Sequence, residues 1–232
     1  MSRRADARPD QAGLLLLFGG SFDPVHDGHL HVANRLCEIL HPDRLDFLPA
    51  ARSPLKGQGA PAADRLAMLR LALAGKPTLG VDTRELDRPP PSFTIDTLRS
   101  ARRETGADRR IAFILGLDSL LALPRWREWR SLTDEAHLVV VHRPGERWNP
   151  SPELAEWLNG RRCDDPDLLE CQPNGRVLVL DIPPCDVSST GIRLALARGD
   201  SPETLPLPPA VAHYIRQHPS LYGATPAHEP CL

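Results

Sequence analysis

Short apolar segments alternate with longer segments of helical period along most of this chain. The apolar segments predict five buried β-strands, at residues 14–18, 45–48, 111–115, 138–141 and 177–180. Apolar residues spaced three and four positions apart predict five helices, near residues 29–40, 62–74, 93–105, 151–159 and 189–198. Such alternation is typical of βαβ units, in which the strands run parallel and helices cover both faces. The pattern therefore predicts an α/β fold with a doubly wound parallel sheet.

The two ends of the chain lack this periodicity. Residues 1–11 are charged and polar, and residues 224–232 have a similar character, so we expect both to be disordered. The remaining residues, 12–223, are predicted to form a single domain. Within it, the proline-rich stretch 143–175 is long for a connection in a compact domain, and it is predicted to be a partly helical insertion without functional residues.

The charge balance limits which partners the chain can have. It contains 28 lysine and arginine residues against 30 aspartate and glutamate residues, a net charge of −2, which argues against a protein that coats nucleic acid. No apolar run approaches the roughly 18 residues of a membrane span, and the N-terminus does not resemble a secretory signal. We therefore expect a cytoplasmic protein with neither nucleic acid nor membrane as partner.

The cysteines indicate neither a disulfide framework nor a zinc site. They are odd in number and no two have a C-x-x-C spacing; they are Cys37, Cys163, Cys171, Cys185 and Cys231. We expect reduced thiols and no metal site built from protein side chains.

The most informative segment follows the first predicted strand and precedes the first predicted helix. Gly19 and Gly20 allow the backbone to approach a ligand closely, and Gly28 allows another group to lie against the first helical turn. A helix N-terminus offers unpaired N–H groups and a positive dipole end, and ligands of parallel sheets bind at the carboxyl ends of the strands. His26 and His29 can add imidazole donors there. The segment therefore predicts a phosphate-binding site.

Other roles are open to the histidines of this segment. With His31, the residues His26 and His29 could bind a metal ion, but the region supplies no thiolate or obvious further ligand to complete such a site. A single histidine here could also be a structural residue at a helix start. The combination of glycines, histidines and position favours phosphate binding, and His31 is expected to be structural.

A second segment, near the C-terminal end, has a similar character. Ser188 is an N-cap candidate, the hydroxyls of Ser189 and Thr190 follow it, and Arg193 lies one turn into the predicted helix with a planar fork suited to phosphate oxygens. Alone, these residues are typical of an ordinary helix cap. Together with the sequence HDGH at 26–29, they resemble the two signatures of the nucleotidyltransferases that share an HxGH motif with class I aminoacyl-tRNA synthetases.

The middle of the chain narrows this resemblance to the bacterial nicotinate-nucleotide adenylyltransferases. Nearly all of 14–222 follows that family in consistent order, and the segments that carry the resemblance are SFTIDTL (92–98), GLDSL (116–120), WREW (126–129), YI (214–215) and LY (221–222). The chain departs from the family at Ser21, where threonine is common, and at Phe93, where tyrosine is frequent and would supply a hydroxyl donor. Pantetheine-phosphate adenylyltransferases are similar but shorter, have threonine in place of His26 and lack the tryptophan segment.

This resemblance implies a Rossmann-like fold of the nucleotidyltransferase type and an enzyme of NAD biosynthesis. ATP and nicotinate mononucleotide would give nicotinate adenine dinucleotide and pyrophosphate, with the mononucleotide phosphate attacking the α-phosphorus in line. A phosphate nucleophile is already ionised at neutral pH, so no general base is needed. Mg²⁺ is expected to bridge the ATP phosphates, because it usually takes its oxygens from substrate and water. A homo-oligomer is left open.

The resemblance also implies roles for individual residues. Those implied to be catalytic are His26, His29 and Arg193. Asp118 would accept from a ribose hydroxyl, and its alternative role is a helix N-cap. The full ATP-binding set implied is Gly19, Gly20, Ser21, Phe22, His26, His29, Gly116, Asp118, Ser188, Ser189, Thr190 and Arg193.

The mononucleotide would meet a different set of residues. Trp126 would stack on the pyridine ring, and the backbone N–H groups of Thr94 and Arg127 would receive the nicotinate carboxylate. Lys56, on the loop after the second strand, would reach the substrate phosphate, or would be an ordinary solvated lysine. Core packing is the alternative for Trp126 and is favoured for Trp129.

Other functions are compatible with parts of this pattern. The chain could be a regulatory module that binds nucleotide without turnover, or an adenylyltransferase for another phosphorylated substrate, such as nicotinamide mononucleotide or pantetheine phosphate. A fragment of an aminoacyl-tRNA synthetase is disfavoured, because the chain has no recognisable anticodon-binding module, basic patch or lysine-rich second signature.

Overall fold

Parallel strands form a single sheet in the part of the chain that the structure describes. The structure is a computed structural model, and it describes residues 13–51, 59–142, 145, 147–183 and 185–223. The strands are β1 (Leu14–Gly20), β2 (Arg44–Pro49), β3 (Leu79–Val81), β4 (Arg110–Gly116), β5 (His137–His142), β6 (Arg162–Cys163) and β7 (Val177–Asp181). Their order is β3-β2-β1-β4-β5-β7-β6, and every pairing is parallel. The order reverses between β1 and β4, which is where such sheets bind ligands.

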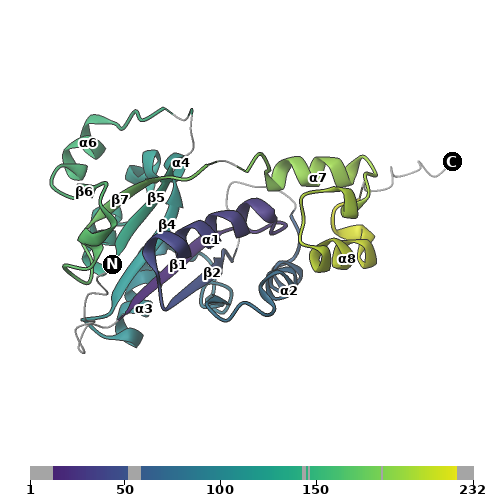
Figure 1. Cartoon of the computed structure of the whole chain (residues 1–232), viewed down its shortest axis with the longest axis horizontal. Coiled ribbons are helices and arrows are strands. Elements are labelled where there is room, and N and C mark those ends of the chain that lie inside the picture. The colour runs from purple at the N-terminus through teal and green to yellow at the C-terminus, as the bar shows by residue number, and fades with distance from the viewer. Residues whose placement is uncertain (1–12, 52–58, 143–144, 146, 184, 224–232) are drawn as a thin grey trace, which may run out of the picture.

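Helices lie on both faces of the sheet and beyond one end of it (Figure 1). The α-helices are α1 (Asp27–Leu40), α2 (Ala62–Leu73), α3 (Thr94–Thr105), α4 (Leu117–Leu121), α5 (Leu132–Glu135), α6 (Pro152–Leu158), α7 (Ser189–Ala197) and α8 (Pro209–Gln217). The short 3₁₀ helices are η1 (Leu123–Arg125), η2 (Trp129–Ser131), η3 (Pro166–Leu169), η4 (Pro202–Thr204) and η5 (Pro219–Leu221).

Two hydrophobic cores, one on each face, hold the helices to the sheet. Side chains alternate along β1, so that Leu14 and Leu16 belong to one core, and Leu15 and Leu17 belong to the other. The first core continues into α1, α2, α7 and α8, and the second continues into α3, α4, α5 and α6. Burial on both faces explains why the strands are nearly continuous apolar runs. The predicted α/β fold with a doubly wound parallel sheet is confirmed.

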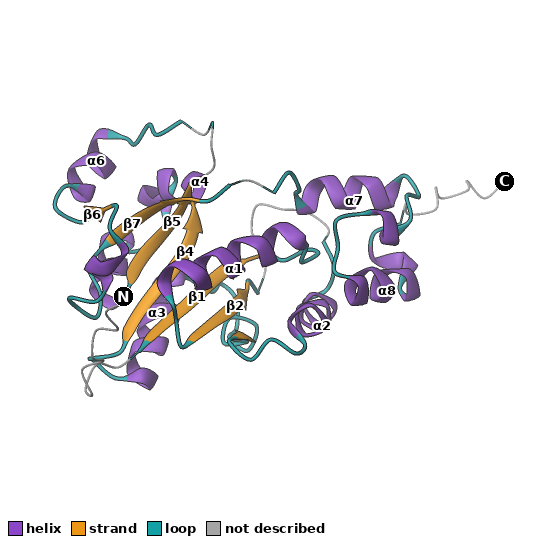
Figure 2. Cartoon of the chain, viewed as in Figure 1, coloured by secondary structure: helices purple, strands orange, loops and turns teal. Residues whose placement is uncertain are grey.

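A C-terminal unit, residues 188–222 with the helices α7 and α8, lies at the end of the sheet where α1 begins (Figure 2). It packs against α2, and the Tyr214 hydroxyl of α8 donates to Oδ1 of Asp64 in α2 at 2.8 Å. Residues of both α7 and α8 belong to the first core. This packing brings the segment that begins α7 close to the segment that begins α1.

Several short elements were not predicted from the hydrophobic pattern. β3 consists of three half-buried residues, and β6 consists of the exposed Arg162 and the buried Cys163. Both strands lie at edges of the sheet, and neither contains an apolar run long enough to detect. The helices α4 and α5 span little more than one turn. α8 was also missed, and it begins at Pro209, a residue type that is favourable in a first helical turn.

The stretch 143–175 contains α6, β6 and η3 and is therefore partly helical, as predicted. β6 pairs with β7 and extends the sheet by one strand, so part of this stretch belongs to the main architecture. The ends predicted to be disordered, 1–11 and 224–232, lie outside the described residues.

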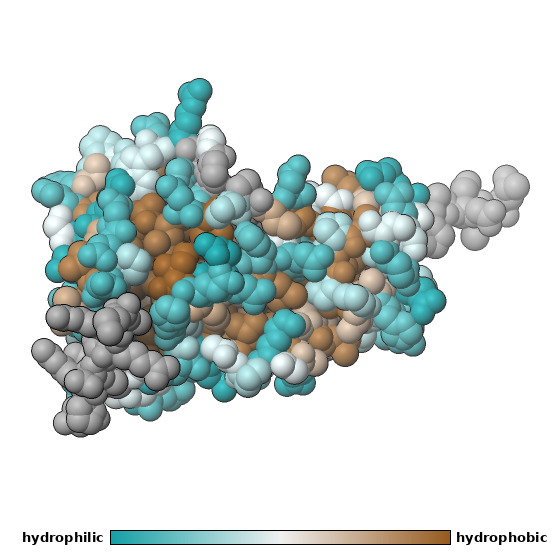
Figure 3. Space-filling view, in the orientation of Figure 1, coloured by the Kyte–Doolittle hydropathy of each residue, from teal (hydrophilic) through white to brown (hydrophobic). Residues whose placement is uncertain are grey.

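The surface is mixed in character. Figure 3 shows hydrophilic residues over most of one face, with hydrophobic residues gathered to the left of centre, where Figure 1 has the sheet above α1. Among the helices that the structure describes, none is both long enough and apolar enough to cross a membrane.

Candidate active site

The first motif, residues 19–29, runs from the end of β1 through a loop to the start of α1. The second motif, residues 188–193, lies at the start of α7. β1 ends with Gly19 and Gly20, and His26 is the N-cap of α1, with an extended backbone. Phe22 has φ 48°, a left-handed conformation that is uncommon for a bulky residue, and its side chain is fully buried. The carbonyl of Ser21 accepts from a buried arginine, Arg65, at 2.7 Å. The surrounding core therefore fixes the shape of this loop.

His26 and His29 lie face to face at the start of α1. Their rings stack with 3.7 Å between centroids, and the backbone N–H of His26 donates to Nδ1 of His29 at 3.2 Å. A neutral imidazole that accepts at Nδ1 carries its proton at Nε2, so His29 presents Nε2 as a donor. His31 lies farther along α1, and its Nε2 contacts the carbonyl oxygen of Pro183 at 3.1 Å.

Both stacked histidines line a small cavity of about 50 Å³ at the carboxyl ends of the central strands. The other lining residues come from β1, α1, β5 and the segment after β7; they are Phe18, Gly28, Val32, Val141, Ile182, Pro183, Cys185 and Val187. Pockets for small ligands usually measure several hundred Å³. A nucleotide would therefore extend out of this cavity or widen it.

Two glycines of the first motif make room for the protein's own side chains. A Cβ at Gly28 would lie 2.7 Å from Cγ1 of Val187, so the glycine lets the segment before α7 lie against the first turn of α1. This confirms that another group packs there. A Cβ at Gly20 would lie 2.8 Å from the Phe22 ring, so a protein ring occupies the space that the sequence analysis assigned to a ligand.

The start of α7 meets the loop that carries the first motif. Ser188 is the N-cap of α7, and its Oγ accepts from the backbone N–H of Gly191 at 3.1 Å, so the predicted cap is confirmed. The hydroxyl of Ser189 donates to the carbonyl oxygen of Pro24 at 3.1 Å. The structure therefore brings the two motifs together, although more than 150 residues separate them in the sequence.

Arg193 links the two motifs a second time. Its Nη1 donates to the carbonyl oxygen of Asp23 at 2.7 Å, and its Nη2 donates to Oγ1 of Thr190 at 3.2 Å. The guanidinium is half-buried, which favours charge-assisted hydrogen bonds over solvation. Both nitrogens of the fork are thus held at the junction between α1 and α7.

Asp118 lies at the position where the strand order reverses. It follows β4, which is the neighbour of β1 in the sheet, and its side chain is exposed. Gly116 is the N-cap of α4, and Asp118 is in the first turn of that helix. The alternative prediction that Asp118 is a helix N-cap is therefore wrong, and its carboxylate is accessible at the carboxyl edge of the sheet.

The tryptophans after α4 differ in burial. Trp129 is 5% exposed and packs edge-on against Trp157 with 5.1 Å between centroids, so the preference for core packing is confirmed. Trp126 is only half-buried, at the margin of the second core. Part of its ring is therefore available to a ligand.

The segments that contain Arg127 and Thr94 lie against each other. The guanidinium of Arg127 lies over the ring of Phe93, 4.9 Å from the centroid, and Nη1 is 3.9 Å from Oδ2 of Asp96. Thr94 is the first residue of α3, and the N–H groups of a first helical turn have no acceptor within the helix. The predicted pairing of these two backbone segments near one site is compatible with this arrangement.

Three buried polar residues to which the sequence analysis gave no role hold the first motif in place. They are Asp23, Arg65 and Tyr222. Asp23 lies inside the motif, so its position was a usable signal, whereas nothing in the sequence around Arg65 marks it. Lys56, which was assigned to the substrate phosphate, lies outside the described residues.

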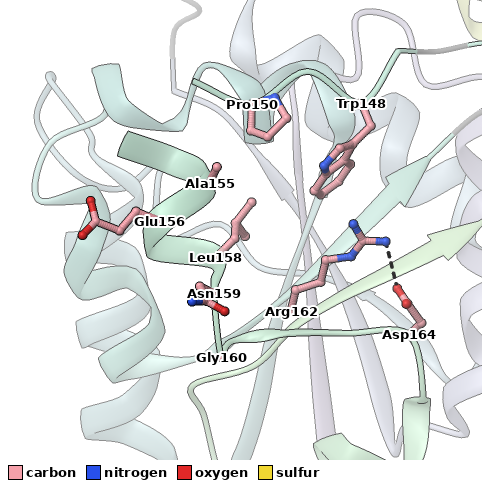
Figure 4. Close-up of a pocket in the computed structure, with 9 residues that line it drawn as sticks. All are labelled: Trp148, Pro150, Ala155, Glu156, Leu158, Asn159, Gly160, Arg162 and Asp164. Atoms are coloured by element: carbon pink, nitrogen blue, oxygen red, sulfur yellow. Dashed lines mark hydrogen bonds and ion pairs between the residues drawn. The ribbon is translucent and has the colours of Figure 1, made fainter. Parts of the chain in front are cut away.

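A larger pocket, of about 530 Å³, lies elsewhere, beside α6 and β6. Figure 4 shows Trp148 and Arg162 close together on one side of it; the guanidinium lies over the indole, 4.5 Å from the centroid. Arg162 also donates to Asp164 at 3.3 Å. None of its lining residues belongs to the two motifs, so the smaller cavity beside His26 and His29 is the candidate active site.

Known proteins are similar to this chain over most of its length. The family model "Cytidylyltransferase-like" matches residues 17–195. The chain is similar to a probable nicotinate-nucleotide adenylyltransferase of Yersinia enterocolitica, with 46% identity over 87% of this chain and 92% of the relative. It is similar to another, from Laribacter hongkongensis, with 45% identity over 91% and 96% of the two chains.

A solved structure with the same fold is the Plasmodium falciparum nicotinic acid mononucleotide adenylyltransferase, which was determined in complex with NaAD. Its TM-score is 0.68 and its identity is 17%, over 90% of this chain and 97% of that one. The two converging helix starts, the matching family model and the identity to relatives over most of their length agree with one another. This chain belongs to the nicotinate-nucleotide adenylyltransferases, within the cytidylyltransferase-like family.

Proposed function

We propose that this protein transfers the adenylyl group of ATP to nicotinate mononucleotide, a step in NAD biosynthesis. The observation that carries the proposal is the convergence of the two motifs, in which Arg193 of α7 donates to Asp23 of the loop before α1. Two helix N-termini and a guanidinium meet there, and this combination suits a chain of phosphates. The similarity to two probable nicotinate-nucleotide adenylyltransferases of bacteria supports the same reaction.

In this reaction an oxygen of the mononucleotide phosphate bonds to the α-phosphorus of ATP, and the bond from that phosphorus to the bridging oxygen breaks. The products are nicotinate adenine dinucleotide and pyrophosphate. Because the attacking phosphate is already ionised at neutral pH, the protein has no proton to remove. Its work is to hold two polyanions in line and to stabilise the charge that develops on pyrophosphate.

The residues at the junction of the two motifs would have different roles in the reaction. His29 would donate from Nε2, and His26 and Arg193 would contact the phosphates that leave. Backbone groups of the loop from Gly19 to Phe22 would face the α-phosphate. Asp118, in the first turn of α4 after the neighbouring strand β4, would accept from a ribose hydroxyl.

A magnesium ion would enter the site with ATP. Among the described residues there is no group of three or more histidine, cysteine, aspartate or glutamate side chains that could hold a metal ion. The donors present therefore suit an ion held mainly by phosphate oxygens and water, which would neutralise part of the phosphate charge. The residue roles given above do not depend on it.

The pyridine end of the substrate would lie near the half-buried Trp126. Its ring would stack on the pyridine, and backbone N–H groups at Thr94 and Arg127 would face the carboxylate. An amide in place of that carboxylate presents a donor where an acceptor is needed. The site should therefore prefer nicotinate mononucleotide over nicotinamide mononucleotide.

Pyrophosphate release tests the proposal directly. Purified protein with ATP and Mg²⁺ should release pyrophosphate when nicotinate mononucleotide is added, and should do so less efficiently with nicotinamide mononucleotide or pantetheine phosphate. Binding of ATP without release in any of these mixtures would instead identify a regulatory module. Equal kcat/KM for the acid and amide mononucleotides would reject the carboxylate contacts.

A further inference from the structure

Tyr222, near the C-terminal end of the described chain, contacts the loop between β1 and α1. This loop, residues 20–26, is called the phosphate loop below. Its hydroxyl donates to Oδ1 of Asp23 at 2.7 Å, across a sequence separation of 199 residues. Both side chains are buried, at 8% and 9% exposure. The same Oδ1 accepts from the backbone N–H of Ala60 at 3.1 Å. Asp23 therefore joins the first motif, the segment before α2 and the C-terminal unit.

Arg65 supplies the positive charge that such a buried carboxylate requires. Its side chain is 6% exposed, and it donates to backbone carbonyls of three segments: to Ser21 at 2.7 Å, to Ala50 at 2.8 Å and to Ala60 at 3.3 Å. It is thus held by carbonyl groups, and it acts on Asp23 through its charge. Burial and the bond to Asp23 raise the pKa of Tyr222 far above its ordinary range, so the phenol keeps its proton and remains the donor.

The backbone of the same residue serves the candidate active site. The carbonyl of Asp23 accepts from Arg193, and the carbonyl of the next residue, Pro24, accepts from Ser189. The side chain of Asp23 is held from one side by Tyr222 and Ala60, while its carbonyl fixes Arg193 on the other. A shift of this peptide would therefore move the guanidinium that faces the phosphates, and errors of about 1 Å at a reacting centre can cost about 10²-fold in rate.

We infer that Tyr222 is a positioning residue for the ATP side of the site, acting through Asp23 on Arg193. The inference rests on the proposed function, in which Arg193 contacts ATP. It gives the C-terminal unit a part in the reaction beyond covering the first core. No direct contact between Tyr222 and a substrate is implied, because the tyrosine is buried behind the loop.

The test compares Tyr222→Phe with Tyr214→Phe. Each change removes one tyrosine hydroxyl that donates to an aspartate from the C-terminal unit, at 2.7 Å and 2.8 Å respectively, but only Tyr222 meets the phosphate loop. Tyr222→Phe should lower kcat/KM for ATP by about 5- to 150-fold, because Oδ1 of Asp23 would then keep only the N–H of Ala60 as a donor and the peptide that holds Arg193 could shift. KM for nicotinate mononucleotide should change less than about twofold, and Tyr214→Phe should leave all constants within about twofold.

Three outcomes would overturn the inference. They are wild-type kinetics in Tyr222→Phe, an equal loss toward both substrates, and a loss explained by a reduced folded fraction in circular dichroism.

A double-mutant cycle separates action through Arg193 from a local effect. If Tyr222 works through that guanidinium, the ATP defect of Tyr222→Phe should be much smaller in an Arg193→Lys background, whereas full additivity would contradict the inference. ATP binding by isothermal titration calorimetry needs no turnover. If the wild-type protein bound ATP but released no pyrophosphate, the proposed function would be rejected. The inference on Tyr222 would still be tested, because the ATP affinities of Tyr222→Phe and wild type could be compared by calorimetry.

Discussion

Two imidazoles stack at the start of α1, and one hydrogen bond decides which nitrogen of His29 carries its proton. Because Nδ1 accepts from the backbone of His26, the donor that can face a phosphate is Nε2. The sequence predicts His29 as an imidazole donor at a helix N-terminus, and the structure adds this orientation. His31 on the same helix provides a control for the loss of an imidazole, because its Nε2 contacts the carbonyl oxygen of Pro183 in an exposed position.

His29→Ala should lower kcat by about 10²- to 10³-fold, because it removes one preorganised donor to the charge that builds on pyrophosphate. Steady-state pyrophosphate release measures this effect. His31→Ala is the matched control and should stay within about threefold of wild type. If His29→Ala kept more than a third of wild-type turnover, His29 would have no catalytic role.

Arg193→Lys should raise KM for ATP by roughly tenfold, since a lysine keeps the charge but cannot hold two oxygens with a planar fork. Kinetics at saturating nicotinate mononucleotide would measure the change. Arg198→Lys, at the C-terminal end of the same helix and paired with Asp200, should be without effect. Unchanged kinetics in Arg193→Lys would limit this arginine to its structural bonds with Asp23 and Thr190.

At the scale of elements, the segment between α4 and α5 separates a structural tryptophan from an accessible one. Trp129 completes the second core, and the half-buried Trp126 lies at its margin. The segment is held to the start of α3 through Arg127 and Phe93. The segment between α4 and α5 therefore packs into the second core through Trp129 and leaves the ring of Trp126 partly accessible.

Trp126→Ala should raise KM for nicotinate mononucleotide by about 5- to 150-fold, which corresponds to about 1–3 kcal/mol of lost stacking. KM for ATP should hardly change. Trp148→Ala, which removes a tryptophan beside α6 and outside the candidate site, controls for the general loss of an indole. A defect specific to ATP would return Trp126 to a purely structural role.

His137 joins β5 to the segment that leads into β7. It is fully buried, its Nε2 contacts the carbonyl oxygen of Gln172 at 2.9 Å, and its Nδ1 accepts from the backbone N–H of Arg176 at 3.0 Å. Both contacts together require a neutral ring with its proton on Nε2. Burial, more than any other cause, lowers the pKa of His137 from 6.5 to about 4.

This lowered pKa predicts a loss of stability in mild acid. As the pH falls below 6.5, the unfolded chain takes up a proton at His137 that the folded protein resists until about pH 4. The free energy of unfolding should therefore decrease across this window, by about 3 kcal/mol from this residue. Urea titrations at pH 7, 6, 5 and 4 would measure it. His137→Gln, which keeps a donor and an acceptor without titrating, should flatten the slope; an unchanged slope would assign the loss to other groups.

At the scale of the whole molecule, the long apolar strands and amphipathic helices could be predicted from the sequence because each carries a clear period. β3 and β6 could not, since strands of two or three residues at a sheet edge depend on neighbours rather than on their own pattern. The sequence predicts both motifs as helix N-termini that bind phosphate. The bonds between them, from Arg193 to Asp23 and from Ser189 to Pro24, arise from tertiary packing, which no local pattern encodes.

The bond from Tyr222 to Asp23 also orders events during synthesis. A chain is made from its N-terminus, and domains begin to fold while later residues are still missing. β1, α1 and β2 can pair early, yet the buried carboxylate of Asp23 receives its phenol donor only after residue 222 has emerged. A growing chain should therefore acquire the sheet before it acquires a fully ordered phosphate loop, so that competence to use ATP arrives among the last steps of maturation.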